Sequence, residues 1–262
     1  MAAEQPMITN PAKDKLKRGE AVTGLAVFES LRPSIYKIVA QVGCDMVLVD
    51  TEHVIHNFDI LTDFLVGARD NGLTPVVAVV APDRALVSRT LDAGALGIIL
   101  SHADTPEQAA DLVRWMKYPP AGERGLAPGA NAGYTTGDLA RYCREANDAT
   151  LVILKIESRM GVENAEAMMS IDGIDGIIFG PGDLAADMGL HDQWKHPEVL
   201  AAIESVIELA LARGIAVEPS VMPDREGYRR ELERGCLIFG PTRTSEYTLF
   251  REAALNAMAP YR

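Results

Sequence analysis

Three kinds of feature are scarce in this sequence, and each scarcity excludes a class of protein. Cysteine occurs only three times in 262 residues, at scattered positions, so neither a disulfide framework nor a cysteine-rich zinc site is expected. No apolar run reaches the ~18 residues of a membrane-spanning helix. Positive charge is also in deficit, since the net charge is −12. Nucleic acid and membrane surfaces are therefore unfavourable partners.

Leader and nucleotide-binding motifs are missing as well. The first 20 residues are polar and partly basic with no apolar core, which predicts no secretory signal peptide. A soluble, cytoplasmic protein is therefore expected. No Gly-x-Gly-x-x-Gly follows the first expected strand and no Walker-type loop is present, so a dinucleotide-binding fold has little support.

What the chain does contain is a regular alternation of short apolar runs and amphipathic stretches. Strands are expected at 21–28, 46–49, 75–80, 97–100, 150–156, 174–179, 215–221 and 236–239. Helices are expected at 33–42, 58–71, 84–93, 105–116, 137–145, 161–169, 197–213 and 224–234. This pattern predicts the α/β class and a single (β/α)8 TIM barrel over 21–262, with an N-terminal arm at 1–20 and a helical tail at 242–259. A doubly wound open sheet is the alternative.

The stretch from Ile174 to Leu184 is the strongest candidate for a functional segment. Its apolar run ends abruptly in Gly180-Pro181-Gly182, and Asp183 follows at once. Glycines let the backbone approach a ligand and expose its N–H groups, and α/β barrels place their chemistry at the carboxyl ends of strands. Asp183 is therefore a candidate site residue. The alternative is an ordinary turn in which Asp183 caps the next helix.

A second carboxylate, Glu157, ends the preceding expected strand. Neighbouring parallel strands lie ~4.8 Å apart, so Glu157 and Asp183 are expected to share one hard cation. Two carboxylates leave space for water and substrate oxygens, which suits Mg²⁺ or Mn²⁺. The alternative is that Glu157 forms an ion pair with Lys155 or Arg159.

His53 follows the second expected strand in the run Asp50-Thr51-Glu52-His53. A histidine among acids at the mouth of a barrel can transfer a proton near neutral pH. Asp50 or Asp92 would orient it. The alternative is a surface loop histidine without a catalytic role.

Two further side chains are weaker candidates. Arg124 lies in the long Pro- and Gly-rich segment 117–135, where it would contact a substrate carboxylate or a neighbouring subunit. His102 lies just beyond the fourth expected strand, where it would line the barrel mouth.

Five motifs occur in the order in which one family carries them, over about residues 20 to 250. They are Asp50-x-Glu52-His53, Leu91-Asp92-Ala93-Gly94-Ala95, Tyr118-Pro119-Pro120-Ala121-Gly122-x-Arg124-Gly125, Ile156-Glu157 and Gly180-Pro181-Gly182-Asp183-Leu184. Together they resemble the HpcH/HpaI family, the class II metal-dependent pyruvate aldolases named for 4-hydroxy-2-oxo-heptane-1,7-dioate aldolase. The resemblance implies a TIM barrel, usually a homo-hexamer that exchanges a C-terminal helix. It also implies cleavage or formation of a carbon–carbon bond between a 2-oxo acid and an aldehyde through a metal-bound enolate.

The resemblance also implies roles for individual residues. Glu157 and Asp183 would hold the divalent ion, Mg²⁺ or Mn²⁺ with Co²⁺ as a further option. The backbone at Gly182 and Asp183 would receive the substrate carboxylate. His53 would act as general base or acid, with Asp92 and Asp50 orienting it.

The chain departs from the family pattern at two positions. The third strand of the family usually ends in Pro-Val-Val-Arg, whereas this chain has Ala78 in place of the arginine, and Lys155 stands where the family tends to carry glutamine. Side chains alternate along a strand, so Lys155 and Glu157 face the same way. We therefore expect Lys155 to replace the missing positive charge, unless it only neutralises Glu157 or Asp183.

The missing arginine leaves two alternative functions open. One is another enolate-forming reaction, such as metal-dependent decarboxylation of a β-oxo acid. The other is a barrel that has lost catalysis and serves as a binding protein, although Glu157, Asp183 and His53 are all present.

Overall fold

The computed structural model describes residues 6–80, 83–134, 137–221 and 224–261. Its centre is a sheet of eight parallel strands in the order β7-β6-β5-β4-β3-β2-β1-β8. The strands are β1 (Val22–Val27), β2 (Met46–Asp50), β3 (Thr74–Val80), β4 (Gly97–Ser101), β5 (Leu151–Ile156), β6 (Gly176–Phe179), β7 (Ala216–Val217) and β8 (Ile238–Phe239). A backbone hydrogen bond from Leu237 N to Val217 O (3.1 Å) joins the two ends of this order. The predicted TIM barrel is confirmed, and the open-sheet alternative is wrong.

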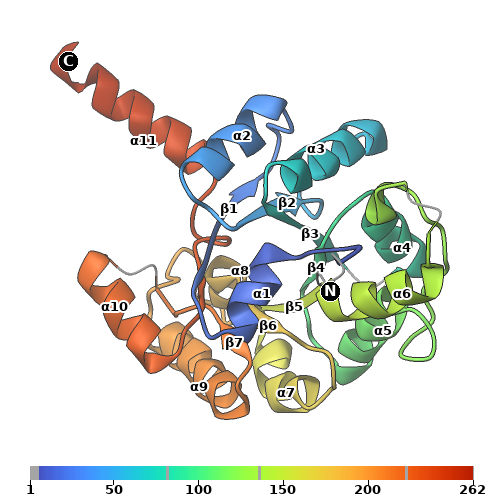
Figure 1. Cartoon of the computed structure of the whole chain (residues 1–262). Coiled ribbons are helices and arrows are strands. Elements are labelled where there is room, and N and C mark those ends of the chain that lie inside the picture. Colours follow the sequence, from blue (N-terminus) through green and yellow to red (C-terminus); the bar gives the residue numbers. More distant parts are fainter. Residues whose placement is uncertain (1–5, 81–82, 135–136, 222–223, 262) are drawn as a thin grey trace.

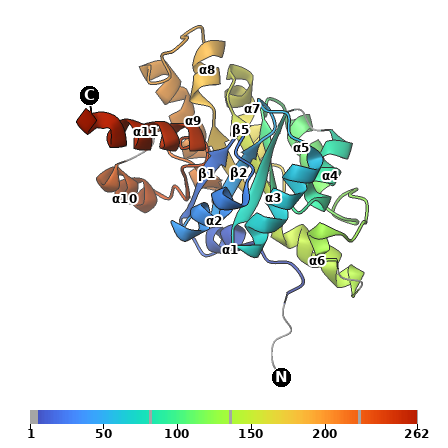
Figure 2. The same ribbon diagram turned by 90° about the horizontal axis from the view of Figure 1, so that it is seen from above.

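Helices surround the barrel, as Figures 1 and 2 show. They are α1 (Pro11–Lys17), α2 (Pro33–Gln41), α3 (Phe58–Asp70), α4 (Arg84–Asp92), α5 (Pro106–Met116), α6 (Leu139–Ala149), α7 (Arg159–Met169), α8 (Pro181–Asp187), α9 (Pro197–Arg213), α10 (Arg225–Arg234) and α11 (Glu246–Met258). Short 3₁₀ turns lie at Ala130–Ala132 and Ala259–Tyr261. None of the described helices is long and apolar enough to span a membrane.

Local sequence explains where most of these elements begin and end. The side chains of Thr105 and Gln108 form a reciprocal capping box at the start of α5. Gly214 and Gly235 end α9 and α10 in the left-handed conformation that glycine adopts without strain. These signals are local, so the sequence places the corresponding boundaries correctly.

Two elements differ from the sequence-based prediction. The seventh strand is expected at 215–221, but β7 pairs only over Ala216–Val217, and 222–223 lie outside the described residues. The short helix α8 is not expected at all. It begins directly at Pro181, the first-turn position that proline favours, and places Asp183 in its first turn rather than at its cap.

The strands carry apolar side chains on both faces, and these form two layers of core. Side chains that point to the barrel axis, such as Leu48, Val76 and Ile153, form an inner cluster. Those that point outward, such as Val47 and Val77, pack against the helices. Burial on both faces accounts for the continuous apolar runs in the sequence.

Helix α1 lies across the middle of the ring in Figure 1. Its Ala12 is fully buried, and Asn10 at its cap donates to the carbonyls of Leu96 (3.0 Å) and Ala149 (2.7 Å). Lys13 forms an ion pair with Asp175 (2.9 Å). All these partners precede or begin strands, so this part of the expected arm closes the N-terminal end of the barrel and leaves the opposite end open.

Unlike α1, the last helix, α11, does not pack into the barrel. It projects away from the barrel in Figures 1 and 2, and none of its residues is buried. Its apolar side chains, including Phe250 (78% exposed), face solvent in the single chain.

Candidate active site

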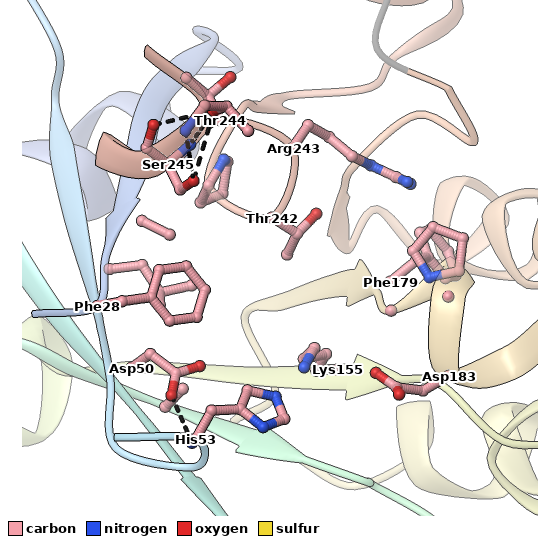
Figure 3. A pocket seen from close by; sticks show the side chains of 18 residues that line it. Phe28, Asp50, His53, Lys155, Phe179, Asp183, Thr242, Arg243, Thr244 and Ser245 are labelled. Carbon is pink, nitrogen blue, oxygen red and sulfur yellow. Dashed lines mark hydrogen bonds between the residues drawn. The ribbon is translucent and has the colours of Figure 1, made fainter. Parts of the chain in front are cut away.

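A cavity of about 290 Å³ lies at the carboxyl ends of the strands. The ends of β1, β2, β3, β5 and β6 line it, together with the segment that follows β8. This volume lies at the lower end of the ~300–1,000 Å³ of small-molecule sites. Figure 3 shows Asp50, His53, Lys155 and Asp183 around this space, so four of the residues predicted to carry the chemistry meet in one cavity.

Glu157 is the buried acid of the site. It directly follows β5, and its side chain is fully buried. Oε1 accepts a hydrogen bond from the backbone N–H of His102 (2.7 Å), whereas Oε2 contacts the ammonium of Lys155. Burial raises the pKa of the Glu157 carboxyl, an effect that Lys155 opposes.

Lys155 lies between two carboxylates. Its ammonium is 2.7 Å from Glu157 Oε2 and 3.3 Å from Glu52 Oε2. Burial alone would lower the pKa of Lys155, but Glu157 and Glu52 raise it, so the side chain remains a cation. The prediction that Lys155 and Glu157 face the same way is confirmed, and the ion pair between them that the sequence left open is present.

Gly180 makes room for the Glu157 carboxylate. A Cβ at this position would lie 2.8 Å from Glu157 Cβ, closer than real Cβ contacts allow. The sequence suggests that glycine here allows a ligand to approach the backbone. Its observed function is to accommodate the carboxylate on the neighbouring strand.

Glu52 is a site residue that we did not single out from the sequence. Its carboxylate lies 3.4 Å from His102 Nε2 and 3.7 Å from His53 Nε2, with its side chain only 7% exposed. Burial alone would raise the pKa of Glu52, but the Ser101 hydroxyl and the Lys155 ammonium hold it below its usual value. The run Asp50-Thr51-Glu52-His53 could have indicated Glu52. Side chains two residues apart in an extended chain point the same way, so Glu52 can face the barrel mouth together with Asp50.

Asp50 fixes the segment that carries His53. Its Oδ1 accepts a hydrogen bond from the backbone N–H of His53 (2.7 Å), as the dashed line in Figure 3 shows. The His53 ring itself is 55% exposed at the cavity mouth. Asp50 thus positions the His53 backbone rather than its imidazole.

Asp92 and Arg124 lie apart from this cavity. Asp92 accepts hydrogen bonds from Arg124 (2.8 Å) and Asn131 (3.1 Å), and the Arg124 guanidinium lies over the Tyr118 ring (4.6 Å). The Arg124 side chain is only 2% exposed. The expectation that Asp92 orients His53 is therefore not met within one chain, and Arg124 is already paired and buried rather than open to a substrate carboxylate.

Asp183 and Gly182 line the cavity from the first turn of α8. No described residue accepts a hydrogen bond from the backbone N–H of either one. The first N–H groups of a helix lack intrahelical partners and attract anions. The predicted location of Asp183 at the barrel mouth thus agrees with the geometry.

The donor set of the mouth suits a hard divalent cation. Potential ligand atoms of Glu52, His102 and Glu157 lie within 4.8 Å of one another, as do those of Asp50, Glu52 and His53. Carboxylate oxygens dominate both groups, and buried Glu157 Oε2 is held only by the Lys155 ammonium. The group of Glu52, His102 and Glu157 therefore fits such an ion once Lys155 moves aside from Glu157, whereas Asp183 belongs to neither group.

Comparison with known proteins assigns the family. Residues 27–240 match the family described as HpcH/HpaI aldolase/citrate lyase. The chain belongs to this family. A 2-keto-3-deoxy-L-rhamnonate aldolase of Klebsiella pneumoniae is 35% identical to it over 220 residues, 82% of each chain.

Solved structures of this family have the same fold. An HpcH/HpaI aldolase from Desulfitobacterium hafniense superimposes with a TM-score of 0.88, at 28% identity and 95% coverage of both chains. An HpcH/HpaI aldolase/citrate lyase family protein from Burkholderia cenocepacia gives 0.85, at 29% identity over 97% of this chain and 100% of the other.

Membership of the HpcH/HpaI family confirms several predictions made from the sequence. The protein is a carbon–carbon lyase of the class II aldolase type that acts on small molecules, and its family depends on a divalent cation. The decarboxylase and non-catalytic alternatives gain no support from these relatives.

Proposed function

We propose that this HpcH/HpaI protein is an aldolase for 2-oxo acids, and that it cleaves or forms the bond between a pyruvate-like unit and an aldehyde. The observation that carries the proposal is the carboxylate of Glu157, fully buried directly after β5, with one oxygen that contacts only the Lys155 ammonium. A 2-keto-3-deoxy sugar acid, the type of substrate in the name of the Klebsiella pneumoniae relative, belongs to the proposed substrate class.

Glu157 and Asp183 would hold the divalent ion, for which Mg²⁺ or Mn²⁺ is the proposed choice and Co²⁺ an acceptable substitute. Both are hard oxygen donors, and they follow the neighbouring strands β5 and β6. A bound ion there supplies Lewis-acid stabilisation of the negative charge that develops on a 2-oxo acid. Glu52 and His102 lie close enough to Glu157 to adjust its position.

The free N–H groups of Gly182 and Asp183 would bind the substrate carboxylate. They stand at the first turn of α8, where unpaired backbone donors face the cavity. Lys155 would then face the keto oxygen. It comes from β5, whereas the family's arginine, Ala78 here, comes from β3, and an ammonium is a point donor rather than a fork.

His53 would move the proton. Its ring is exposed to the cavity and stands 3.7 Å from Glu52, while Asp50 holds the backbone of His53 in place. An imidazole in this position can take a proton from the aldehyde-side hydroxyl or return it, directly or through water.

Proton exchange at the pyruvate methyl group tests the proposal without knowledge of the aldehyde. In D₂O with Mg²⁺ or Mn²⁺, we expect the protein to exchange these protons and EDTA to abolish the exchange. Glu157→Gln should lose exchange, whereas Glu163→Gln, an exposed glutamate on α7, should retain it. Exchange that persists in EDTA, or that survives Glu157→Gln, would refute the metal-assisted mechanism.

We also infer that the chain works as a homo-oligomer, with a hexamer as the form that the family resemblance implies. Helix α11 has no buried residue and exposes Phe250, Leu255 and Met258. Apolar faces of this kind favour association with another copy. Cytoplasmic localisation stays a prediction from the sequence.

A further inference from the structure

The imidazole of His102 lies beside the buried acid of the site and has no chemical role in the scheme above. His102 directly follows β4, and it belongs to none of the five motifs through which the chain resembles its family. Its backbone N–H donates to Glu157 Oε1 (2.7 Å). The residue is therefore anchored to the carboxylate that would hold the divalent ion.

The backbone of His102 keeps its ring at the barrel mouth. Its φ of 48° lies in the left-handed region, which residues other than glycine seldom adopt. In this conformation the N–H reaches Glu157, while the side chain is 42% exposed. The ring is thus accessible to an ion from solution and stays next to a buried carboxylate.

Three side chains and an ammonium outline a position for a cation. Lys155 Nζ is 2.7 Å from Glu157 Oε2 and 3.3 Å from Glu52 Oε2, so a positive charge already lies between the two acids. His102 Nε2 is 3.4 Å from Glu52 Oε1, and the potential ligand atoms of the two acids and His102 all lie within 4.8 Å of one another. Opposite ligands of a Mg²⁺ ion stand about 4.2 Å apart. The three groups are therefore spaced to surround one ion in place of the ammonium.

We propose that the His102 imidazole is a ligand of the ion that Glu157 binds, so that the site offers a nitrogen donor as well as carboxylate oxygens. This proposal rests on the proposed function, which supplies the ion. Mg²⁺ takes oxygen ligands almost exclusively, whereas imidazole is a good ligand for the later first-row metals. The nitrogen donor therefore shifts the preference of the site from Mg²⁺ toward Co²⁺. In the alternative, His102 stays paired with Glu52 and never touches the ion.

Pulsed electron paramagnetic resonance of the Mn²⁺-loaded protein tests the assignment without any turnover. Wild type should show the ¹⁴N coupling of a directly bound imidazole, and His102→Asn and His102→Gly should both lose it. Asparagine and glycine tolerate the left-handed conformation, so the backbone N–H of residue 102 stays on Glu157 in both variants. His191→Asn, at an exposed position outside the site, should retain the coupling.

Calorimetry tests the consequence for metal preference. The Kd for Co²⁺ should rise by about 10-fold or more in His102→Asn, the range found when groups that support a metal site are removed. The Kd for Mg²⁺ should change by less than about threefold, because Mg²⁺ gains little from nitrogen. Equal changes for the two ions would contradict the nitrogen ligand.

His53 provides the sharpest alternative, because its Nε2 is also near Glu52 (3.7 Å). A wild type without ¹⁴N coupling, coupling that survives both substitutions of His102, or coupling lost only in His53→Asn would overturn the proposal. Pyruvate proton exchange decides the proposed function separately. Exchange that EDTA abolishes, in a protein without ¹⁴N coupling, would leave the aldolase mechanism intact and refute His102 as a ligand. Exchange that persists in EDTA would refute the metal-assisted mechanism, and the ¹⁴N coupling would still decide the ligand.

Discussion

The ammonium group of Lys155 lies where the proposed cation and the substrate keto oxygen must also be accommodated. It contacts Glu157 and Glu52, and it shares the cavity with Ala78, which replaces the arginine of the family. Movement of the Lys155 ammonium toward the substrate on ion binding would give this side chain two roles. It holds the acids together in the empty site and stabilises negative charge in the loaded one.

Lys155→Met tests these two tasks together. Turnover of the 2-oxo acid should fall by about 10²–10³, the usual cost of one lost donor to a developing oxyanion. The Kd for Mn²⁺, measured by calorimetry, should decrease at the same time, because the variant lacks the positive charge that repels Mn²⁺ from Glu157. Arg159→Met, on the exposed start of α7, is the control. Wild-type turnover in Lys155→Met would show that Lys155 does not replace the arginine.

Gly180→Ala tests how precisely Glu157 must be placed. The new Cβ would lie 2.8 Å from Glu157 Cβ, so the carboxylate must shift. We expect Mn²⁺ affinity to fall about 10-fold or more, because a metal site must hold its ligands close to one geometry. Gly182→Ala is the matched control, because a Cβ at Gly182 meets nothing within 4 Å. Equal Mn²⁺ affinity in the two variants would contradict the role given to Gly180.

At the scale of elements, the parts that could be predicted from the sequence depend on local signals. Apolar runs, caps and glycine stops place seven of the strands and most helices close to their observed bounds. Strand ends also predict that Glu157, Asp183 and His53 lie at one end of the barrel, because a parallel barrel brings its carboxyl ends together. The early end of β7 has a local signal that the prediction missed, because Pro219 has no N–H to donate to a neighbouring strand.

Lys117, the residue that ends α5, has an ionisation that is coupled to folding. Lys117 donates to the carbonyls of Asn147 (2.6 Å) and Thr150 (3.1 Å). Burial, together with the positive charge of Lys13, lowers the pKa of Lys117 to about 7. In the unfolded chain the pKa of a lysine is about 10.4.

Between about pH 7 and pH 10, the unfolded chain therefore binds a proton at Lys117 that the folded chain does not. The free energy of unfolding should rise with pH in this window, by about 1.4 kcal/mol per pH unit from this group. In Lys117→Met this contribution should disappear, which urea denaturation at pH 7, 8 and 9 would show. Lys17→Met, an exposed lysine paired with Asp148, is the control. Parallel slopes for wild type and Lys117→Met would contradict the lowered pKa.

At the scale of the whole molecule, α11 is the element that a single barrel leaves without a partner. It packs little against its own chain and exposes Phe250 (78%), and the 3₁₀ turn after it exposes Tyr261 (82%). The isolated 28.3 kDa chain would keep this apolar face in water, so association is expected.

Phe250→Glu should disrupt that association. In sedimentation velocity, wild type should be larger than one 28.3 kDa chain, and the variant should shift toward smaller species with its circular dichroism preserved. Glu252→Gln, on the same exposed helix, is the control. A monomeric wild type, or a variant with unchanged sedimentation, would contradict the inference of a homo-oligomer through α11.

The rest of the site depends on contacts that no local pattern contains. Arg243 and Glu218 are 25 residues apart in the sequence, and their proximity follows from closure of the barrel between β7 and β8. Likewise, Asp92 resembles a site residue in its motif, but Arg124, 32 residues later in a loop, forms an ion pair with it. Tertiary placement, rather than residue type, decides which charged side chains reach the cavity.

The most direct test of the central claim is a crystal structure with Mn²⁺ and pyruvate, with the ion located by its anomalous signal. The claim predicts one peak bonded to both Glu157 and Asp183, with Lys155 turned from Glu157 toward the pyruvate. No peak with Lys155 still on Glu157, or a peak held by Glu52 and His102 without Asp183, would contradict it.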